Sequence, residues 1–419
     1  MRDITTEVLV IGGGSAGMAA AAELRERNHS VAIVERENLL GGILNQCIHN
    51  GFGLHRFKEE LTGPEYAERY ASIIEKSSID VFTGTTVTEI AKCGEGKKVY
   101  AYSASHGMLI FHVKAVVLAM GCRERNRGNI GTPGTRPAGI YTAGLAQRLV
   151  NMEGLMPGSK CVIVGSGDIG LIMARRMSWV GADVKAVVEI QPYPAGLTRN
   201  IVQCLNDFNI PLHLSHVVSE IYGKDRVEGV DVTPIRQGVE VTKETFHIEC
   251  DTLLLSVGLI PDNEIARKAG IAINPETNGP LVDSSLMTNI EGIFACGNVL
   301  HVHDLVDFVS EESQRCGTFV SDYIQGKEEK KQFRIVPGSN LKYVIPNRFR
   351  ADRDNHFYMR SLIVRNHAEL VLTLNGKELS RKKLRHIQPS EMISFKLGEK
   401  DLPDSVLGEE SSLEISLVG

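Results

Sequence analysis

Two repeated strand–turn–helix–strand units and a β-rich C-terminal segment predict an α/β fold. The first unit runs from Val8 to Glu35, the second from Cys161 to Glu189, and helical and glycine-rich patterns stop after residue 331. We expect two Rossmann-like domains, the second inserted in the first, and a small C-terminal β domain. The expected bounds are 1–125 and 259–326 for the two parts of the first domain, 126–258 for the second domain and 334–419 for the third.

The first unit places a GxGxxG pattern between an apolar strand and an alanine-rich helix. Gly12 permits the sharp turn, Gly14 lets the backbone approach a pyrophosphate, and Gly17 lets the helix pack on the strand. The helix N-terminus offers free N–H groups and the positive end of its dipole to phosphates. Glu35 ends the next strand, about 20 residues on, where a carboxylate can accept hydrogen bonds from ribose hydroxyls. These features predict a bound dinucleotide.

The rest of the first domain follows from the apolar pattern. A loop rich in Gly, Asn and Gln at 41–53 is placed to run under the ring system of the cofactor. Helical spacing covers 64–78, and a buried strand at 115–121 stops at a glycine. Shorter strands are expected at 79–82 and 85–90, with a hairpin-like pair at 98–102 and 109–113.

The second unit repeats the arrangement. A strand at 161–164 leads into glycines 165, 167 and 170, a helix runs through Trp179, and a strand at 183–188 ends at Glu189. Two such units predict two dinucleotide sites. Because Glu189 is followed by Ile-Gln-Pro and not by arginine, its carboxylate should repel a ribose phosphate, so the second site should prefer NAD. The alternative is a second unit that acts as a nucleotide-free scaffold.

Two further strands, 253–257 and 292–296, also deliver glycines to the carboxyl edge of a sheet, where ligands of open α/β sheets bind. A helix is expected at 304–324, followed by a charged linker at 326–331. Beyond it the expected elements are strands at 358–364, 370–374, 392–397 and 413–418, with a tight turn at Asn375-Gly376. The basic run 381–386 is most simply a solvated face, and a partner-docking surface is the alternative.

Composition limits the possible partners and location. The chain has 419 residues, 42% of them hydrophobic, a net charge of −5 and eight scattered cysteines without a CxxC pair. This balance gives no indication of a nucleic-acid partner, and no apolar run is long enough to span a bilayer. No cleavable signal pattern precedes the first strand. We therefore expect a soluble, cytoplasmic protein.

Taken together, the motifs from residue 5 to 326 resemble the pyridine nucleotide-disulfide oxidoreductase superfamily. The resemblance implies FAD at the first GxGxxG and NAD at the second, with strand ends at 119–121 and 257–261. The last motif of that family normally ends in Gly-Asp, whose carboxylate bonds the flavin's ribityl chain. This chain has Gly297-Asn298, which keeps one hydrogen bond and lacks the negative charge.

The resemblance implies a set of cofactor contacts. For FAD they are Gly12, Gly14, Ser15, Ala16, Gly17, Glu35, Arg36, Gly41, Gly42, Cys47, Asn50, Val87, Ala119, Gly121, Gly297, Asn298 and Leu305. For NAD they are Gly165, Gly167, Asp168, Ile169, Gly170, Glu189 and Gly258.

The superfamily's redox dithiol is missing. Cys47 stands alone, and no cysteine occupies the stretch 141–144. Thiol–disulfide exchange needs two thiols that form and break a bond with each other, so thioredoxin or glutathione reductase activity is not expected. Stretches 121–125, 134–144 and 296–304 instead resemble the flavoprotein found beside anaerobic glycerol-3-phosphate dehydrogenase and the flavin subunits of opine, proline and sarcosine-type dehydrogenases.

The sequence therefore predicts hydride transfer between NAD(H) and FAD in a redox subunit, with a partner dehydrogenase subunit or electron acceptor protein and a homo- or hetero-oligomeric state. One alternative is a self-contained NADH oxidase or peroxidase in which Cys47 is the catalytic residue. Another is a non-catalytic FAD-binding scaffold. His301, His303 and Asp304 could be considered metal ligands, but we expect them to line the cofactor's pyrimidine end, and no metal is predicted.

Overall fold

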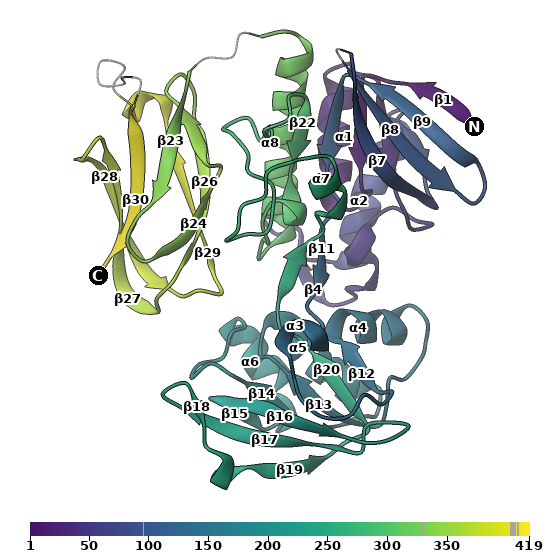
Figure 1. Ribbon diagram of the computed structural model, residues 1–419, viewed down its shortest axis with the longest axis vertical. Coiled ribbons are helices and arrows are strands. Elements are labelled where there is room, and N and C mark those ends of the chain that lie inside the picture. The colour runs from purple at the N-terminus through teal and green to yellow at the C-terminus, as the bar shows by residue number, and fades with distance from the viewer. Residues whose placement is uncertain (95, 328–330, 403–407, 409) are drawn as a thin grey trace. The chain divides into compact units, whose positions relative to one another are not determined.

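The structure is a computed structural model that describes residues 1–94, 96–327, 331–402, 408 and 410–419 (Figure 1). The chain divides into two compact units. The first consists of Met1–Cys122 and Pro261–Gly419, and the second, Arg123–Ile260, is inserted in the sequence of the first. The predicted α/β class is confirmed, whereas the predicted linker at 326–331 lies partly outside the described residues.

A parallel five-stranded sheet forms the centre of the first unit. Its order is β22-β10-β2-β3-β6, and all its neighbouring strands are parallel. The bounds are Val8–Ile11 for β2, Val31–Val34 for β3, Asp80–Phe82 for β6, Ala115–Leu118 for β10 and Ile293–Ala295 for β22. The chain leaves the central strand β2 toward β3, while β10 lies on the other side, so the glycine turn after β2 occupies the topological switch point where such sheets bind ligands.

Among the described residues, the helices of this unit are α1 (Ser15–Glu26), α2 (Gly63–Lys76), α7 (Glu264–Lys268) and α8 (Val306–Ile324). The alanines of α1 are buried on all sides, and their small size lets the helix approach both the sheet and α8. A capping box between Thr62 and Glu65 fixes the start of α2. Within the described part of the chain, no helix is long and apolar enough to cross a membrane.

The predicted hairpin is confirmed within a four-stranded sheet of order β1-β9-β8-β7. Its strands are β1 (Arg2–Thr5), β7 (Thr85–Cys93), β8 (Gly96–Ser103) and β9 (Gly107–Val113). The smaller elements of the first unit, with the two connecting strands, are η1 (Gly42–Gln46), β4 (Asn50–Phe52), β5 (Leu61–Thr62), β11 (Cys122–Glu124), β21 (Leu259–Pro261) and η4 (Gly297–Val299).

The second unit has three layers, visible in teal in Figure 1. Its parallel sheet has the order β12-β20-β13-β14-β15. One face of this sheet, with Ile163 and Leu254, packs against helices, and the other, with Val162 and Leu253, packs against an antiparallel sheet. The elements are α3 (Arg127–Ile130), β12 (Ile140–Thr142), α4 (Ala143–Asn151), β13 (Lys160–Val164), α5 (Asp168–Trp179), β14 (Asp183–Glu189), α6 (Thr198–Cys204), η2 (Asn206–Phe208), β15 (Leu212–Leu214), β16 (His216–Tyr222), β17 (Gly229–Arg236), β18 (Val239–Glu240), η3 (Thr242–Glu244), β19 (Phe246–Glu249) and β20 (Thr252–Leu255).

The C-terminal segment forms a sandwich with a hydrophobic core of its own, including Phe333, Phe357 and Leu413. In the part of this segment that the structure describes, five strands in the order β25-β23-β30-β27-β28 face three in the order β24-β26-β29 (Figure 1). The bounds are β23 (Gln332–Pro337), β24 (Leu341–Ile345), β25 (Arg348–Arg350), β26 (Asn355–Ser361), β27 (Arg365–Leu374), β28 (Lys377–Ile387), β29 (Met392–Leu397), η5 (Glu399–Asp401) and β30 (Ser412–Val418).

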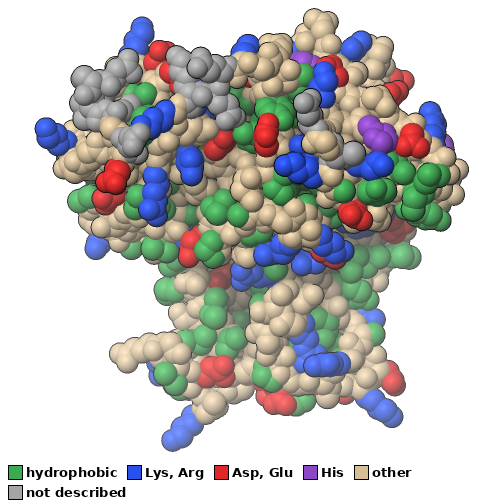
Figure 2. All heavy atoms as spheres, turned by 45° about the horizontal axis from the view of Figure 1, so that its top comes forward, with side chains coloured by type: hydrophobic (Ala, Val, Ile, Leu, Met, Phe, Trp, Pro, Cys, Tyr) green, Lys and Arg blue, Asp and Glu red, His purple; other side chains and the backbone are tan. Residues whose placement is uncertain are grey.

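The basic run 381–386 lies in β28, the edge strand of the five-stranded sheet. Its arginine and lysine side chains are exposed, as expected for a solvated face. Positive charge along an edge strand opposes pairing with a second chain. Figure 2 shows basic and acidic side chains interspersed over the face it presents.

The close packing of α1 on α8 provides a stability test. A methyl group at Gly317 would lie 2.9 Å from the carbonyl oxygen of Ala20 and 2.9 Å from Glu23 Cβ, so the two helices would have to separate. We expect Gly317→Ala to destabilise the first unit by about 1–3 kcal/mol. The midpoint temperature of its thermal unfolding should fall by about 2–4 °C for each kcal/mol lost. Thermal unfolding measures this.

The matched control is Glu75→Ala, an exposed position on α2. This change should stay within about 0.5 kcal/mol of the parent protein. An unchanged midpoint in Gly317→Ala would contradict the packing argument.

Candidate functional site

The first glycine turn is held by the carboxylate of Glu35. Glu35 Oε2 accepts a hydrogen bond from the Gly13 amide at 2.6 Å, and Oε1 accepts one from the Glu37 amide at 2.8 Å. The side chain is 7% exposed, so these bonds fix a nearly buried carboxylate at the end of β3. A methyl group at Gly14 would meet no atom within 4 Å, whereas one at Gly17 would lie 1.8 Å from the Gly12 carbonyl oxygen. Gly17 therefore serves packing, and Gly14 keeps the space at the start of α1 open.

The second turn reproduces this geometry. Glu189 Oε2 accepts from the Ser166 amide at 2.8 Å and from its hydroxyl at 2.6 Å, and Oε1 accepts from the Gln191 amide at 2.9 Å. A methyl group at Gly167 would again meet nothing within 4 Å, whereas one at Gly170 would lie 2.5 Å from the Gly165 carbonyl oxygen. In both GxGxxG turns the second glycine therefore borders open space, and the third glycine is packed against the backbone of the turn.

Asp168, which was predicted to contact NAD, binds residues at the start of α6 through its carboxylate. Its Oδ1 accepts hydrogen bonds from the Leu197 amide at 2.9 Å and from Asn200 Nδ2 at 2.7 Å. This carboxylate therefore holds the start of α6 close to the turn. Ile169 follows it in the first turn of α5, and the carbonyl of Gly258 accepts from the Arg125 amide at 2.9 Å.

Several residues predicted to contact FAD gather around the first turn. The Gly41 amide donates to the Gly13 carbonyl at 2.8 Å, and the Ala119 amide donates to the Ile11 carbonyl at 2.9 Å. Two further glycines pack closely on this turn. A methyl group at Gly42 would lie 3.3 Å from Gly14 Cα, and one at Gly297 would lie 2.7 Å from Ala16 Cβ. The structure thus brings together segments that are far apart in the sequence at one sheet edge.

Other predicted residues lie around this cluster in different settings. Arg36 is exposed and lies 3.8 Å from an Asp262 oxygen, Asn50 begins β4, and Val87 is buried in β7. Ser15 begins α1, Leu305 precedes α8, and Gly121 accepts a hydrogen bond from the Asp262 amide at 3.0 Å.

Cys47 packs against the start of α2. Its carbonyl accepts from the Gly63 amide at 2.8 Å, and a methyl group at Gly63 would lie 2.8 Å from Cys47 Cβ. Burial raises the pKa of the Cys47 thiol to about 12. The thiol therefore stays protonated at neutral pH, where only a thiolate would be an effective nucleophile.

The structure also brings together two cysteines that the sequence spacing does not join. Cys296, at the end of β22, and Cys316, in α8, are both fully buried. Hydrogen bonding to Cys296, together with burial, raises the pKa of the Cys316 thiol. Neither thiol is disulfide-bonded, and their burial separates them from any thiol substrate in solvent.

The loop after β22 is held from behind by Glu312 of α8. Glu312 Oε1 accepts from the Gly297 amide at 2.7 Å, and Oε2 lies 2.8 Å from His301 Nε2 as a hydrogen-bonded pair. The His303 amide donates to Asn298 Oδ1 at 3.0 Å. Burial lowers the pKa of His301 to about 4. Burial opposes ionisation of Glu312, but the two histidines outweigh it and lower the pKa of this carboxyl below its ordinary value.

The C-terminal sandwich holds the other side of the same loop. Asp304 forms an ion pair with Arg360, and its Oδ2 accepts from the Met392 amide at 2.6 Å. Arg360 also donates to the Val302 carbonyl at 3.0 Å. The ring of Tyr358 lies 5.3 Å from that of His301. Asp304, which together with the two histidines was a candidate metal ligand in the sequence, is thus bound to Arg360 and the Met392 amide.

Sequence reasoning missed the residues that hold these loops. Glu312 and Arg360 belong to no local motif, because their partners lie on other elements. Asp307, in the first turn of α8, accepts from the Gly53 amide at 3.2 Å and from the Arg56 amide at 3.1 Å, more than 250 positions away. A buried acid on a helix was the available signal, but it does not identify its partner.

Comparisons with known proteins support a family assignment. Residues 6–316 match the profile of the family described as pyridine nucleotide-disulphide oxidoreductase. The chain is 25% identical over 314 residues to one subunit of the opine oxidase of Agrobacterium tumefaciens, covering 70% of this chain and 61% of that protein. It is 24% identical over 376 residues to dihydrolipoyl dehydrogenase of Pseudomonas aeruginosa, covering 80% of this chain and 73% of that protein.

The fold is similar to that of a solved reductase. The crystal structure of T. acidophilum thioredoxin reductase superposes with a TM-score of 0.63 at 23% identity, covering 78% of this chain and all of that chain. This likeness supports the α/β fold.

The two open glycines allow the sites to be tested separately. A methyl group at either position meets no protein atom, so Gly14→Ala and Gly167→Ala should both fold normally. Because the methyl fills the space where a pyrophosphate must approach, we expect Gly14→Ala to bind FAD at least about tenfold more weakly. Gly167→Ala should keep its flavin and bind NADH at least about tenfold more weakly.

Flavin content, flavin fluorescence on dilution and NADH titration measure these effects. Each variant is the control for the other. Equal flavin content in Gly14→Ala and the parent protein would contradict the assignment of the first turn.

Proposed function

Because the chain belongs to the pyridine nucleotide-disulphide oxidoreductase family, whose members are FAD-dependent NAD(P)H oxidoreductases, we propose that it transfers a hydride between NAD(H) and FAD as a redox subunit of a dehydrogenase complex. FAD would bind at the first glycine turn and NAD at the second. A bound flavin supplies the hydride chemistry, and the protein orients the two cofactors.

The duplicated turn is the observation that supports this proposal most directly. Each turn combines an open glycine at a helix start with a strand-end glutamate fixed by two backbone amides. The open glycine leaves room for a pyrophosphate, and the fixed carboxylate can accept hydrogen bonds from ribose hydroxyls. The residues at both turns therefore fit a dinucleotide.

Glu189 favours NAD over NADP at the second turn. The side chain is 4% exposed, and its bonds to Ser166 and Gln191 prevent it from turning away from the turn. A 2′-phosphate placed there would meet a fixed negative charge, and the following residues provide no arginine to compensate it.

The subunit role rests on the arrangement of thiols and on one relative. The described cysteines provide no exposed dithiol for disulfide exchange, since the neighbouring cysteines, Cys296 with Cys316 and Cys161 with Cys250, are all buried. Electrons must then leave by another route, and a partner protein is the simplest acceptor. The opine oxidase relative is, by its name, one component of a larger enzyme. The glycerol-3-phosphate and amino-acid or opine dehydrogenases are the proposed classes of partner, in the cytoplasm.

The coenzyme preference can be tested by anaerobic reduction of the flavin. We expect NADH to bleach the flavin absorbance at least about tenfold faster than NADPH at equal concentration, because Glu189 repels the extra phosphate. Glu189→Ala should reduce this preference by lowering the rate with NADH.

Glu35→Ala is the matched variant at the first turn. Removal of this carboxylate should lower the flavin content of the purified protein. Bleaching by neither coenzyme, alone or with a partner subunit present, would favour the scaffold alternative and contradict hydride transfer.

Cys47 separates the proposed function from the oxidase alternative. Since burial raises the pKa of this thiol to about 12, we expect Cys47→Ser to keep the rate of flavin reduction by NADH within about twofold of the parent protein. Steady-state NADH consumption with oxygen or peroxide is measured in parallel. Loss of oxidase or peroxidase turnover in Cys47→Ser alone would support the alternative in which this cysteine is catalytic.

A further inference from the structure

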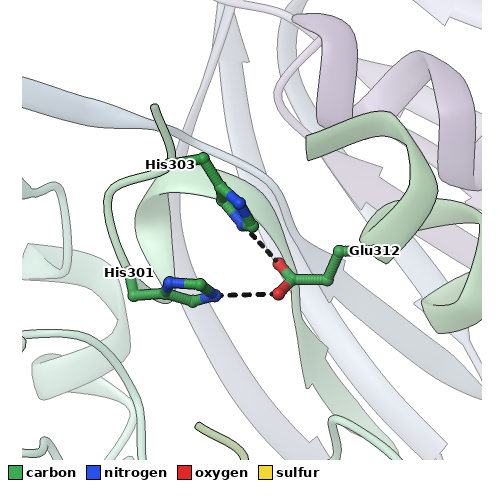
Figure 3. A group of neighbouring side chains, drawn as sticks. All are labelled: His301, His303 and Glu312. Carbon is green, nitrogen blue, oxygen red and sulfur yellow. Dashed lines mark hydrogen bonds and ion pairs between the residues drawn. The ribbon is translucent and has the colours of Figure 1, made fainter. Parts of the chain in front are cut away.

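The side chains of His301, His303 and Glu312 form a buried cluster near the first glycine turn. His301 and His303 come from the loop after η4, and Glu312 comes from the second turn of α8 (Figure 3). All three are buried, and their ligand atoms lie within 4.8 Å of one another. Figure 3 shows both imidazoles directed at the Glu312 carboxylate from the same side.

The distances fit the ligands of one ion. Glu312 Oε2 lies 2.8 Å from His301 Nε2, and Glu312 Oε1 lies 3.2 Å from His303 Nε2. Two ligands that each lie about 2.1 Å from one ion are about 3.4 Å apart in a tetrahedral site and about 3 Å apart at right angles. The ring centroids of the two histidines are 4.2 Å apart, so both imidazoles lie close to the same carboxylate. The imidazole nitrogens and carboxylate oxygens are therefore close enough together to be ligands of one ion.

Hydrogen bonding within the protein does not satisfy this cluster. Among the described residues, six buried side-chain nitrogen or oxygen atoms lack a hydrogen-bond partner, and His301 Nδ1, His303 Nδ1 and His303 Nε2 are three of them. His303 Nε2 is near the carboxylate without the alignment of a hydrogen bond. A buried polar atom without a hydrogen-bond partner in the protein is commonly satisfied by an ion or a water molecule. An ion would satisfy His303 Nε2, and buried water is the usual partner of a ligating imidazole's second nitrogen when no protein acceptor is in reach.

The surrounding charges tolerate a cation. Arg360 is paired with Asp304, and Arg315 is paired with Glu311 and donates to the Tyr358 hydroxyl at 2.8 Å. Both arginines are thus matched by acids of their own, and the Glu312 carboxylate remains available to an ion. Two imidazoles and one carboxylate suit first-row transition ions, whereas magnesium and calcium prefer oxygen ligands.

We propose that His301, His303 and Glu312 bind one divalent first-row transition ion, of which Zn²⁺ and Fe²⁺ are the best matched. From the sequence, no metal was predicted, because His301, His303 and Asp304 come from one short segment that was expected to line the cofactor. The structure turns Asp304 toward Arg360 and brings in Glu312 from α8. The ion's role would be structural: Glu312 also accepts from the Gly297 amide, so the ion would tie the loop to α8.

Metal content of tag-free protein, produced with zinc or iron supplied, tests the proposal by elemental analysis. We expect about one equivalent in the parent protein and less than about 0.1 in His303→Ala and Glu312→Gln. His106→Ala, an exposed histidine in the turn between β8 and β9, is the matched control and should keep the full equivalent.

A second measurement does not depend on whether the buried variants fold. Parent protein treated with chelator should take up one equivalent of Co²⁺ with visible d–d bands, and zinc should displace it. X-ray absorption of the zinc form should report two imidazoles in the first shell. Parent protein that holds less than about 0.1 equivalent and gives no Co²⁺ spectrum would overturn the proposal and leave a purely hydrogen-bonded cluster. Because flavin content and NADH reduction are recorded separately, failure here leaves the proposed function untouched.

Discussion

The carboxylate bonded to backbone amides at the end of a strand is the interaction on which both glycine turns depend. Burying a carboxylate is costly unless hydrogen bonds compensate it. At Glu35 and Glu189 the compensation comes from amides of the turn and of the residue two positions on. The turn, the strand end and the carboxylate therefore hold their positions together, and a dinucleotide would meet acceptors that are already oriented.

A second constraint acts on the loop that follows β22. Glu312 holds Gly297 and His301 from the helix side, and Arg360 and the Met392 amide hold Asp304 from the sandwich side. The C-terminal sandwich is thus more than an appended domain, because two of its strands fix a loop beside the first turn. Asp307 adds a third anchor by binding the amides of Gly53 and Arg56.

The sequence predicted well those features whose cause is local. The GxGxxG spacing, the strand-end glutamates and the hairpin at residues 96–113 depend on neighbours within about 30 positions, and the structure contains them. The antiparallel sheet β16–β19 and strands β23 to β25 were missed, because their patterns are short and mixed. Glu312, Arg360 and the Cys296–Cys316 contact were missed for another reason, since each depends on elements brought together only by the tertiary fold.

The side chains around residue 298 show where negative charge lies near the first turn. Where the resembled family has an aspartate, this chain has Asn298, whose Oδ1 accepts the His303 amide and whose Nδ2 lies 3.7 Å from Cys122 Sγ. An amide makes both contacts, as donor and acceptor, whereas a carboxylate could accept only. The nearby carboxylate is instead Glu312, bonded to the Gly297 amide. In this chain the negative charge beside the loop is therefore on α8 and not in the turn itself, and it also faces two histidines.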